Sequence, residues 1–302
     1  MHAVPVVVVF GPTAVGKTEF LLHFEHIAEI INSDSLQVYR HMSIGTAKPD
    51  KSVTQRIPHH LVDCIDPDKE FSAGDFVNQA DQLCCQIYNR GKLPIIAGGT
   101  GFFLKNFIYG LPESPAASDE VRQLLKKRLD TEGLSALREE LHQKDPESWS
   151  RIKPLDSYRI LRALEVYYTA GLPLSDYKLP DKMRDIYRFL LIGLARDRAE
   201  LYDRINNRVE TMFQNGLPEE YKKLKAMGYS PDCPGLSAIG YKEFSTMEEL
   251  GSLTLNDVKE LIKQNSRNYA KRQITFFKAL PDVHWFHPDQ WEEALKLVSD
   301  FC

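Results

Sequence analysis

Eight residues near the N-terminus have the types and spacing of a phosphate-binding loop. They are Gly11, Pro12, Thr13, Ala14, Val15, Gly16, Lys17 and Thr18, which fit the pattern G-x-x-x-x-G-K-[ST]. Glycines let several backbone N–H groups turn toward one anion, and the helix that follows adds the positive end of its dipole. Lys17 supplies a mobile cation, and Thr18 a hydroxyl suited to Mg²⁺. The loop predicts binding of a diphosphate or triphosphate without specifying which molecule carries it.

Two further polar residues, Asp34 and Thr100, each follow an apolar run typical of a strand. Asp34 follows residues 29–31, and its carboxylate could hold a magnesium ion or accept a proton from a nucleophile; an aspartate here equally suits a turn. Thr100 follows residues 93–97, where its hydroxyl could orient an amine or cap a helix. Ligands of parallel sheets bind beyond the carboxyl ends of strands, so we expect both residues beside the phosphate loop.

Arg208 lies inside the apolar stripe of a predicted helix rather than opposite it. On a helix over residues 201–213, a rotation of about 100° per residue places it with Leu201, Ile205 and Met212. A guanidinium cannot lose its proton to escape burial, so it needs an anionic partner. Its planar fork of N–H donors suits a diphosphate. Alternatively, Arg208 pairs with a buried carboxylate, or its side chain reaches out to water.

Two groups of basic residues are candidates for binding nucleic acid. One recurs in steps of four on the last long helical segment and continues beyond it, at Lys259, Lys263, Arg267, Lys271, Arg272 and Lys278; the other is the pair Arg159 and Arg162. Residues four apart share a helix face, but such stripes are most often simply solvated. His59 and His60 lack the spacing of metal ligands and receive no role.

Alternating apolar runs and helical patterns predict an α/β fold, a P-loop NTPase-like parallel sheet with flanking helices. The predicted strands are 5–10, 29–31, 61–65, 93–97 and 187–194, and the predicted helices are 17–26, 74–89, 198–213, 218–227 and 255–280. Turn-forming residues at 111–115 mark a boundary, after which every segment from 119 to 168 is helical. We therefore expect a catalytic core over 1–110 and 188–302, with C-terminal helices, and an inserted all-helical domain over 111–187.

Composition narrows the class of protein. The chain has 302 residues, 26% of them charged and 43% apolar, as in soluble globular proteins with a substantial core. A net charge of -4 excludes a general positive field, so any nucleic-acid site must be a local patch. The five cysteines include no C-x-x-C pair, which favours a reducing cytoplasm. The apolar N-terminus is too short to span a bilayer, so we expect no membrane association.

Taken together, the motifs resemble those of the bacterial tRNA dimethylallyltransferases, also called tRNA isopentenyltransferases. The stretches that carry the resemblance are 11–18 (GPTAVGKT), 34–40 (DSLQVYR), 45–49 (GTAKP), 58–63 (PHHLVD), 98–101 (GGTG), 162–165 (RALE), 238–242 (AIGYK) and 270–273 (AKRQ). They occur in the family's order from about residue 6 to residue 286, which is nearly the whole chain. The ordered set is far more specific than any one motif.

The resemblance implies a reaction. The exocyclic amine of the adenosine 3′ of the tRNA anticodon would attack the first carbon of dimethylallyl diphosphate, and diphosphate would leave. The loop, usually labelled nucleotide-binding or ATP-binding, would hold the donor's diphosphate with Lys17, Arg208 and a Mg²⁺ near Thr18. Asp34 matches the family's catalytic aspartate, which would accept the amine's proton. Thr100 matches a threonine that would orient the amine.

The resemblance also implies contacts with tRNA. The residues that match are Asp34, Ser35, Leu36, Gln37, Thr100, Arg122, Tyr158, Arg159, Ile160, Leu161, Arg162, Ser237, Ala238, Ile239, Gly240, Tyr241, Lys242, Lys271, Arg272, Gln273 and Lys278. The helical insert would be a mobile clamp on the anticodon stem of a monomeric enzyme. Leu36 stands where the family commonly has an arginine, Phe103 where it has a tyrosine, and Asn268 and Tyr269 replace a more usual polar pair.

Two other functions fit parts of the sequence. A P-loop kinase that phosphorylates a small molecule with ATP has the same loop, but often has a second strand ending in a magnesium-binding aspartate. Here the run 93–97 ends in glycines instead. An RNA-binding module without catalysis would not need the four candidate catalytic residues together. These are Lys17, Asp34, Thr100 and Arg208. The sequence leaves open which tRNAs are modified and whether free adenosine nucleotides are also acceptors.

Overall fold

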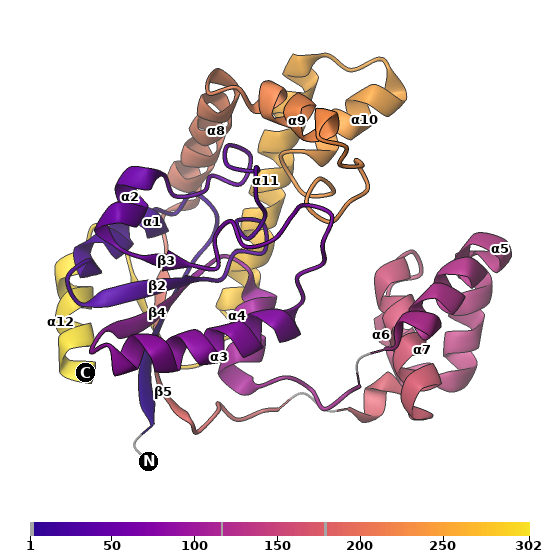
Figure 1. Ribbon diagram of the computed structural model, residues 1–302, viewed down its shortest axis with the longest axis horizontal. Coiled ribbons are helices and arrows are strands. Elements are labelled where there is room, and N and C mark those ends of the chain that lie inside the picture. The colour runs from indigo at the N-terminus through magenta and orange to yellow at the C-terminus, as the bar shows by residue number, and fades with distance from the viewer. Residues whose placement is uncertain (1–2, 116, 178–179) are drawn as a thin grey trace. The chain divides into compact units, whose positions relative to one another are not determined.

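The computed structural model describes residues 3–115, 117–177 and 180–302, and the chain divides into two compact units (Figure 1). The first unit comprises the chain up to Ile108 together with Arg184–Cys302, and the second comprises Tyr109–Met183. The first unit contains the sheet, whereas the second is built of helices. Within the described ranges, no helix combines the length and apolar character needed to cross a membrane.

The first unit is built on a sheet of six strands whose neighbours all run parallel. In spatial order the strands are β3 (His59–His60), β2 (Ala28–Asn32), β4 (Leu93–Gly98), β1 (Val4–Phe10), β5 (Tyr187–Leu194) and β6 (Val283–Phe286). Val9 of the central β1 lies level with Ala97 of β4 and Ile192 of β5. Because these strands are parallel and in register, β1, β2 and β4 present the phosphate loop, Asp34 and Thr100 at one edge.

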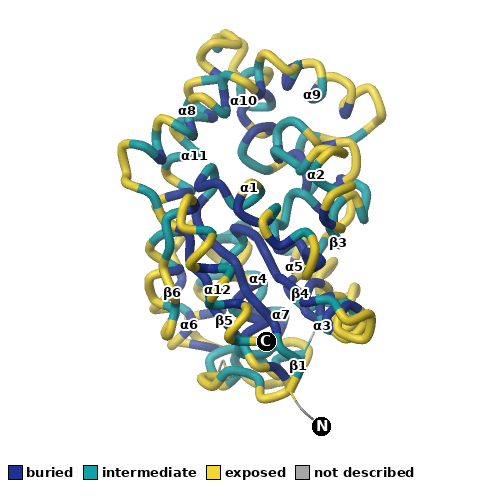
Figure 2. Tube along the Cα trace, turned by 90° about the vertical axis from the view of Figure 1, so that its left-hand side faces the viewer, coloured by how far each residue is buried: buried dark blue, intermediate teal, exposed yellow. Residues whose placement is uncertain are grey.

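The valine run of β1 is buried because helices cover both faces of the sheet (Figure 2). The helix α3 (Ala73–Asn89) packs against β1, β2 and β4. On the other face, alternate strand residues gather with apolar side chains of α1 (Lys17–Leu21), α8 (Arg198–Gln214) and α12 (Trp291–Phe301). This packing attaches α8 directly to the sheet edge that carries the phosphate loop.

The remaining helices of the first unit lie mainly in the C-terminal part of the chain. They are α2 (Lys51–Arg56), α4 (Gly101–Tyr109, whose last residue belongs to the second unit), α9 (Leu217–Ala226), α10 (Lys242–Leu250) and α11 (Leu255–Phe277). A reciprocal capping box between Thr254 and Asp257 starts α11. The long α11 runs past the phosphate loop toward β4, and so brings residues from near the C-terminus to the predicted site.

Several predicted elements need correction. The helix expected over 17–26 ends as an α-helix at Leu21 and tightens into a 3-10 turn, Leu22–Phe24. The strand predicted at 61–65 is wrong, because β3 consists of His59 and His60 and the chain then turns: Leu61 and Asp63 have φ of +60° and +54°. The helices α2, α4, α10 and α12 and the edge strand β6 were not predicted from the sequence.

The second unit has its own small core. Its elements are α5 (Asp119–Lys144), α6 (Pro146–Arg151), α7 (Ser157–Ala170) and the 3-10 turn Leu174–Asp176. Gly133, at φ +83°, breaks α5 into two segments. Leu137 and Leu141 of α5 pack against Ile160 and Leu164 of α7. Ile160 is thus buried and packs within this unit, and its role as a tRNA contact stays a prediction.

Candidate active site

The phosphate loop joins the end of β1 to the start of α1. Gly16 has a φ of +108°, a left-handed conformation that strains any residue with a Cβ atom. Lys17 reaches back over the loop, and its Nζ donates to the carbonyl oxygens of Gly11 and Pro12 at 2.9 and 3.0 Å. The ammonium group therefore lies beside the backbone that would bind an anion.

Two arginines fix the backbone of the loop from the side of α8. Arg204 donates from Nε to the carbonyl oxygen of Ala14 at 2.8 Å, and Arg196 donates to that of Val15 at 2.7 Å. In a trans peptide the C=O and the following N–H point in opposite directions. The N–H of Gly16 therefore faces away from Arg196. The arginines thus orient the loop without occupying the space in front of it.

Arg208 lies on the buried side of α8, where helical spacing places it. Its guanidinium donates to the hydroxyl of Thr13 at 3.1 Å. Burial lowers the pKa of Arg208, and the carboxylate of Asp34 opposes that effect. The side chain nevertheless stays charged, because a guanidinium keeps its proton in proteins even where burial lowers its pKa. A desolvated cation beside the loop gains most from a bound diphosphate.

Gln273 of α11 ties the phosphate loop to the end of β4. The backbone N–H of Thr13 donates to its Oε1 at 2.9 Å, and its Nε2 donates to the carbonyl oxygen of Gly99 at 2.8 Å. The side chain is buried and uses both ends of its amide. Gln273 therefore positions two loops of the site, and its contact with tRNA stays a prediction.

Asp34 and Thr100 meet at adjacent strand ends, as predicted. The Oδ1 of Asp34 accepts from the N–H of Leu36 at 2.9 Å, so this aspartate forms a turn as well as facing Lys17 and Arg208. The hydroxyl of Thr100 accepts from the N–H of Ser35 at 2.9 Å. Thr100 therefore fixes the residue next to Asp34, and its role toward an amine stays a prediction.

The ammonium group of Lys17 has an unusual acidity. Burial, the largest cause, lowers its pKa to about 8, and the positive charge of Arg208 adds to this, while Asp34 and Glu19 pull the pKa upward. An anion bound in the loop would restore the ordinary, fully protonated state. The affinity for that anion should therefore depend on pH near and above 8.

We expect binding of an organic diphosphate to weaken as pH rises above 8, because Lys17 loses its proton there in the ligand-free protein. The dissociation constant should rise by up to about tenfold per pH unit. Calorimetric titration with dimethylallyl diphosphate between pH 6.5 and 9.5 measures it. Lys17→Arg keeps its charge throughout and should give a flat profile. A flat profile for the unaltered protein would contradict the assignment.

A cavity of about 90 Å³ opens beside these groups. The residues that line it are Thr13, Asp34, Ser35, Leu36, Gly45, Thr46, Ile205, Arg208, Val209, Met212, Ile239, Gly240, Ile262, Ser266 and Tyr269. Burial, together with the charge of Asp34, raises the pKa of Tyr269 to about 12, so its hydroxyl remains a hydrogen-bond donor. Charged and hydroxyl groups thus share one cavity with apolar side chains.

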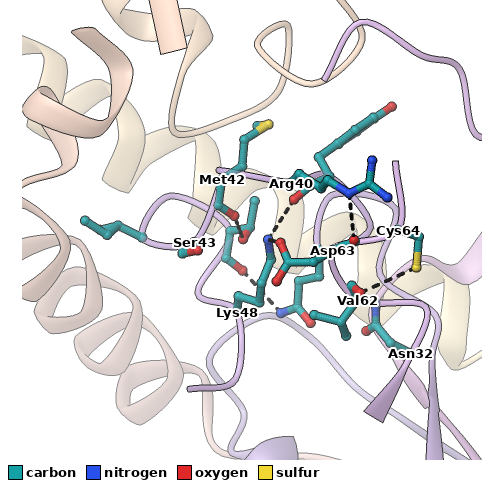
Figure 3. A network of polar contacts seen from close by, with 12 residues as sticks. Asn32, Arg40, Met42, Ser43, Lys48, Val62, Asp63 and Cys64 are labelled. Atoms are coloured by element: carbon teal, nitrogen blue, oxygen red, sulfur yellow. Dashed lines mark hydrogen bonds and ion pairs between the residues drawn. The ribbon is translucent and has the colours of Figure 1, made fainter. Parts of the chain in front are cut away.

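The segment between β2 and α2 forms one wall of the cavity and is held by polar contacts (Figure 3). Lys48, with a side chain only 4% exposed, donates to the carbonyl oxygen of Tyr39 at 2.7 Å and pairs with Asp63 at 2.5 Å. Asn32 donates to the carbonyl oxygen of Leu61 at 3.1 Å. The motifs at 45–49 and 58–63 therefore brace the segment that starts with Asp34.

Glu220 of α9 is an anchor of this wall that the sequence analysis missed. Its carboxylate accepts from the N–H groups of Ser43, Ile44 and Gly45 at 2.9 to 3.1 Å and from the hydroxyl of Tyr241 at 2.7 Å. Tyr241 is fully buried, and its contact with tRNA stays a prediction. A larger hollow of about 670 Å³ lies beside Glu220 but is not lined by the phosphate loop.

Glu220→Ala should lower the free energy of unfolding by about 2–4 kcal/mol, because it leaves four donors without their acceptor. Glu220→Gln keeps one acceptor oxygen and should lose less. Denaturant-induced unfolding measures both. The neighbouring Glu219 is exposed, so Glu219→Ala is the matched control and should stay within about 0.5 kcal/mol. Equal losses at the two positions would exclude the anchoring role.

The basic stripe of α11 is not one continuous surface. Lys259 and Lys263 pair with Glu210 of α8 at 2.9 and 2.5 Å, and Arg267 donates to Asn206 at 2.6 Å. These three residues join α8 to α11, so their side chains already have partners within the chain. Further along the chain, Lys271, Arg272 and Lys278 are exposed.

The other predicted tRNA contacts differ in exposure. In the first unit Ser237 and Lys242 are exposed, whereas Gly240 is buried beside Gly45. In the second unit the exposed residues are Arg122, Tyr158 and Arg159, while Leu161 and Arg162 are partly buried. Gln37 is partly buried, and its amide donates to the carbonyl oxygens of Thr46 and Ala47 at 3.2 Å. Ala238 is also partly buried.

Known proteins of one family match this chain over nearly its whole length. A family model described as IPP transferase matches residues 37–280. A tRNA dimethylallyltransferase of Geobacter sulfurreducens is 43% identical over 299 residues, covering 98% of this chain and 96% of the relative. One of Borreliella afzelii is 41% identical over 295 residues, covering 97% of this chain and 98% of the relative.

Solved structures agree with this result. A tRNA isopentenylpyrophosphate transferase of Bacillus halodurans is 36% identical, with a TM-score of 0.72 over 99% of this chain and 96% of that one. A eukaryotic dimethylallyltransferase described as acting on tRNA is 27% identical, with a TM-score of 0.81 over 98% of this chain and 79% of that one. The chain therefore belongs to the IPP transferase family.

Proposed function

We propose that this protein transfers a dimethylallyl group from dimethylallyl diphosphate to the exocyclic amine of the adenosine 3′ of the anticodon in tRNA. The observation that carries the proposal is that Thr13 of the phosphate loop, Arg208 and Asp34 line a single cavity. Relatives of nearly equal length bear the name tRNA dimethylallyltransferase, which supports the reaction. A kinase would not account for this match.

The geometry suits departure of diphosphate. As the amine nitrogen bonds to the first carbon of the donor, the bond from that carbon to oxygen breaks, and its electron pair stays on the diphosphate. Lys17, Arg208 and the loop N–H groups stabilise that developing charge. They are oriented beforehand by Arg196, Arg204 and Gln273, so little reorganisation accompanies the reaction.

Asp34 accepts the proton that the amine loses when the new bond forms. The turn that its Oδ1 makes with Leu36 fixes the carboxylate at the strand end. Thr100 holds Ser35 and orients the amine. The adenine must leave its stack to reach these groups, which costs a few kcal/mol and least in a single-stranded loop.

The donor atoms fit a magnesium ion that binds together with the diphosphate. Among the residues that the structure describes, no three His, Cys, Asp or Glu side chains gather as ligands. Mg²⁺ commonly uses only one or two protein oxygens plus substrate phosphates and water. The hydroxyl of Thr18 would provide such an oxygen. When bound, the ion would neutralise charge on the diphosphate.

The exposed basic residues support binding of the tRNA backbone. Lys271, Arg272 and Lys278 belong to the first unit, and Arg122 and Arg159 to the second. Beside the latter, Tyr158 is 78% exposed and offers an aromatic surface. We assign the helical second unit, 109–183, the role of a clamp on the anticodon stem, and we expect the enzyme to act as a monomer.

Mass spectrometry of nucleosides tests the proposal. Unmodified tRNA is incubated with the protein, Mg²⁺ and dimethylallyl diphosphate, and the nucleosides are then analysed. We expect an adenosine heavier by one dimethylallyl group, located 3′ of the anticodon. The same assay with adenosine monophosphate tests the free nucleotide as acceptor. Steady hydrolysis of ATP without any prenylated nucleoside would instead support the kinase.

A further inference from the structure

The cavity lies between two helices whose register is known. Arg267 of α11 bonds to Asn206 of α8, and Lys263 of α11 bonds to Glu210 of α8. Residue numbers thus rise along α8 as they fall along α11, so the two helices are antiparallel. In this register Ile205 lies level with Tyr269, Arg208 and Val209 with Ser266, and Met212 with Ile262 along the cavity.

This register separates a polar end from an apolar end. Arg208 of α8 and Ser266 of α11 lie at the level of the phosphate loop, where Arg208 contacts Thr13. One turn further on, Met212 and Ile262 face the same cavity, about 6 Å beyond Arg208 at 1.5 Å per residue. The arginines that precede Arg208 bond to the loop, so the direction toward Met212 leads away from it.

Met212 and Ile262 close the apolar end. They are only 7% and 1% exposed, and both belong to a core cluster that also contains Val38 and Leu217. The cavity volume of about 90 Å³ is small. An engineered apolar cavity of about 150 Å³ binds benzene, a six-carbon ring. The space in front of this wall is smaller, so it restricts the length of a hydrocarbon that enters it.

We propose that Met212 and Ile262 set the length of the hydrocarbon that the enzyme accepts, limiting it to five carbons. This inference rests on the proposed function, because a diphosphate in the loop directs its hydrocarbon toward these two residues. Dispersion contacts with both side chains hold the short chain. A longer chain would have to displace the buried core behind them, which is already close-packed.

The test compares geranyl diphosphate with dimethylallyl diphosphate as donors to tRNA. Met212→Ala and Ile262→Ala each remove about three heavy atoms at the wall. Met212→Ala should raise the ratio of kcat/KM for the longer donor to that for the shorter one by at least about tenfold. The double variant should raise it further. Met212→Phe should lower kcat/KM for dimethylallyl diphosphate by about tenfold or more.

Met42→Ala is the matched control, since Met42 lies in the same core cluster but does not line the cavity. It should leave the ratio unchanged. Calorimetric binding of geranyl diphosphate to the variants supplies a second readout that does not require turnover. An unchanged ratio and unchanged binding in both alanine variants would overturn the inference. Absence of dimethylallyl transfer by the unaltered protein would instead overturn the proposed function.

Discussion

Asp34→Asn should slow prenyl transfer to tRNA by about 10²–10⁴-fold, the usual contribution of a general base. The carboxamide oxygen can still accept from the N–H of Leu36, so the turn should persist while the basic charge is lost. Single-turnover rates measured with saturating donor and tRNA isolate this step. Binding of both substrates should change by no more than a few-fold.

Asp34→Ala provides the comparison that separates the two roles of this aspartate. Alanine removes the turn contact as well as the charge, so it should also loosen the segment that begins at Asp34. If Asn and Ala slow transfer equally and both keep tRNA affinity, the charge is what matters. Unchanged turnover in Asp34→Asn would refute the assignment of Asp34 as the base.

Arg208→Ala should both weaken binding of dimethylallyl diphosphate and slow transfer, together lowering kcat/KM by about 10²–10³-fold. The guanidinium supplies a desolvated fork of donors beside the loop, which a lysine cannot reproduce. Arg208→Lys should therefore recover only part of the loss. Steady-state kinetics with donor as the varied substrate measure all three proteins.

Stability distinguishes this role from a structural one. Burial disfavours the charge on Arg208, so its removal should leave the thermal unfolding midpoint unchanged or slightly higher. Arg198, an exposed arginine on the same helix, is the matched control, and Arg198→Ala should retain activity. A variant Arg208→Ala that unfolds, yet binds donor normally in its folded fraction, would identify the arginine as structural.

Local sequence signals were sufficient for the parts of the site that lie at strand ends. The phosphate loop, Asp34 and Thr100 each follow an apolar run, and parallel strands must bring such ends to one edge. Arg208 was identifiable because its helical position conflicts with its charge. These inferences depend on contacts or periodicity within single elements.

The residues that the sequence did not reveal act over long separations. Glu220 accepts hydrogen bonds from backbone N–H groups about 176 positions earlier in the chain. Nothing in the sequence around Glu220 indicates this role. Arg204 stands four residues before Arg208, a spacing that could have indicated a shared face. The pairing of Lys259 and Lys263 with Glu210 could not be predicted, because a stripe of charge does not reveal which neighbouring helix carries the opposite charge.

Tyr241 and Ile160 show that resemblance to a family does not reveal whether a residue is buried or exposed. Tyr241 lies in the motif 238–242 and Ile160 just before the motif 162–165, and both are buried in the folded chain. A motif records that a residue type recurs, whether it touches a ligand or supports a neighbour that does. Only the packing around Glu220 and within the second unit separates these two cases.

The bond between Thr13 and Gln273 spans 260 positions of the chain. On the ribosome, the loop emerges first, and its partner follows only after roughly 13–50 s of further synthesis at 5–20 residues per second. Until then the loop lacks its tether to the end of β4. The nascent chain therefore lacks a complete site during most of its synthesis. We expect it to bind substrate only after α11 has been made.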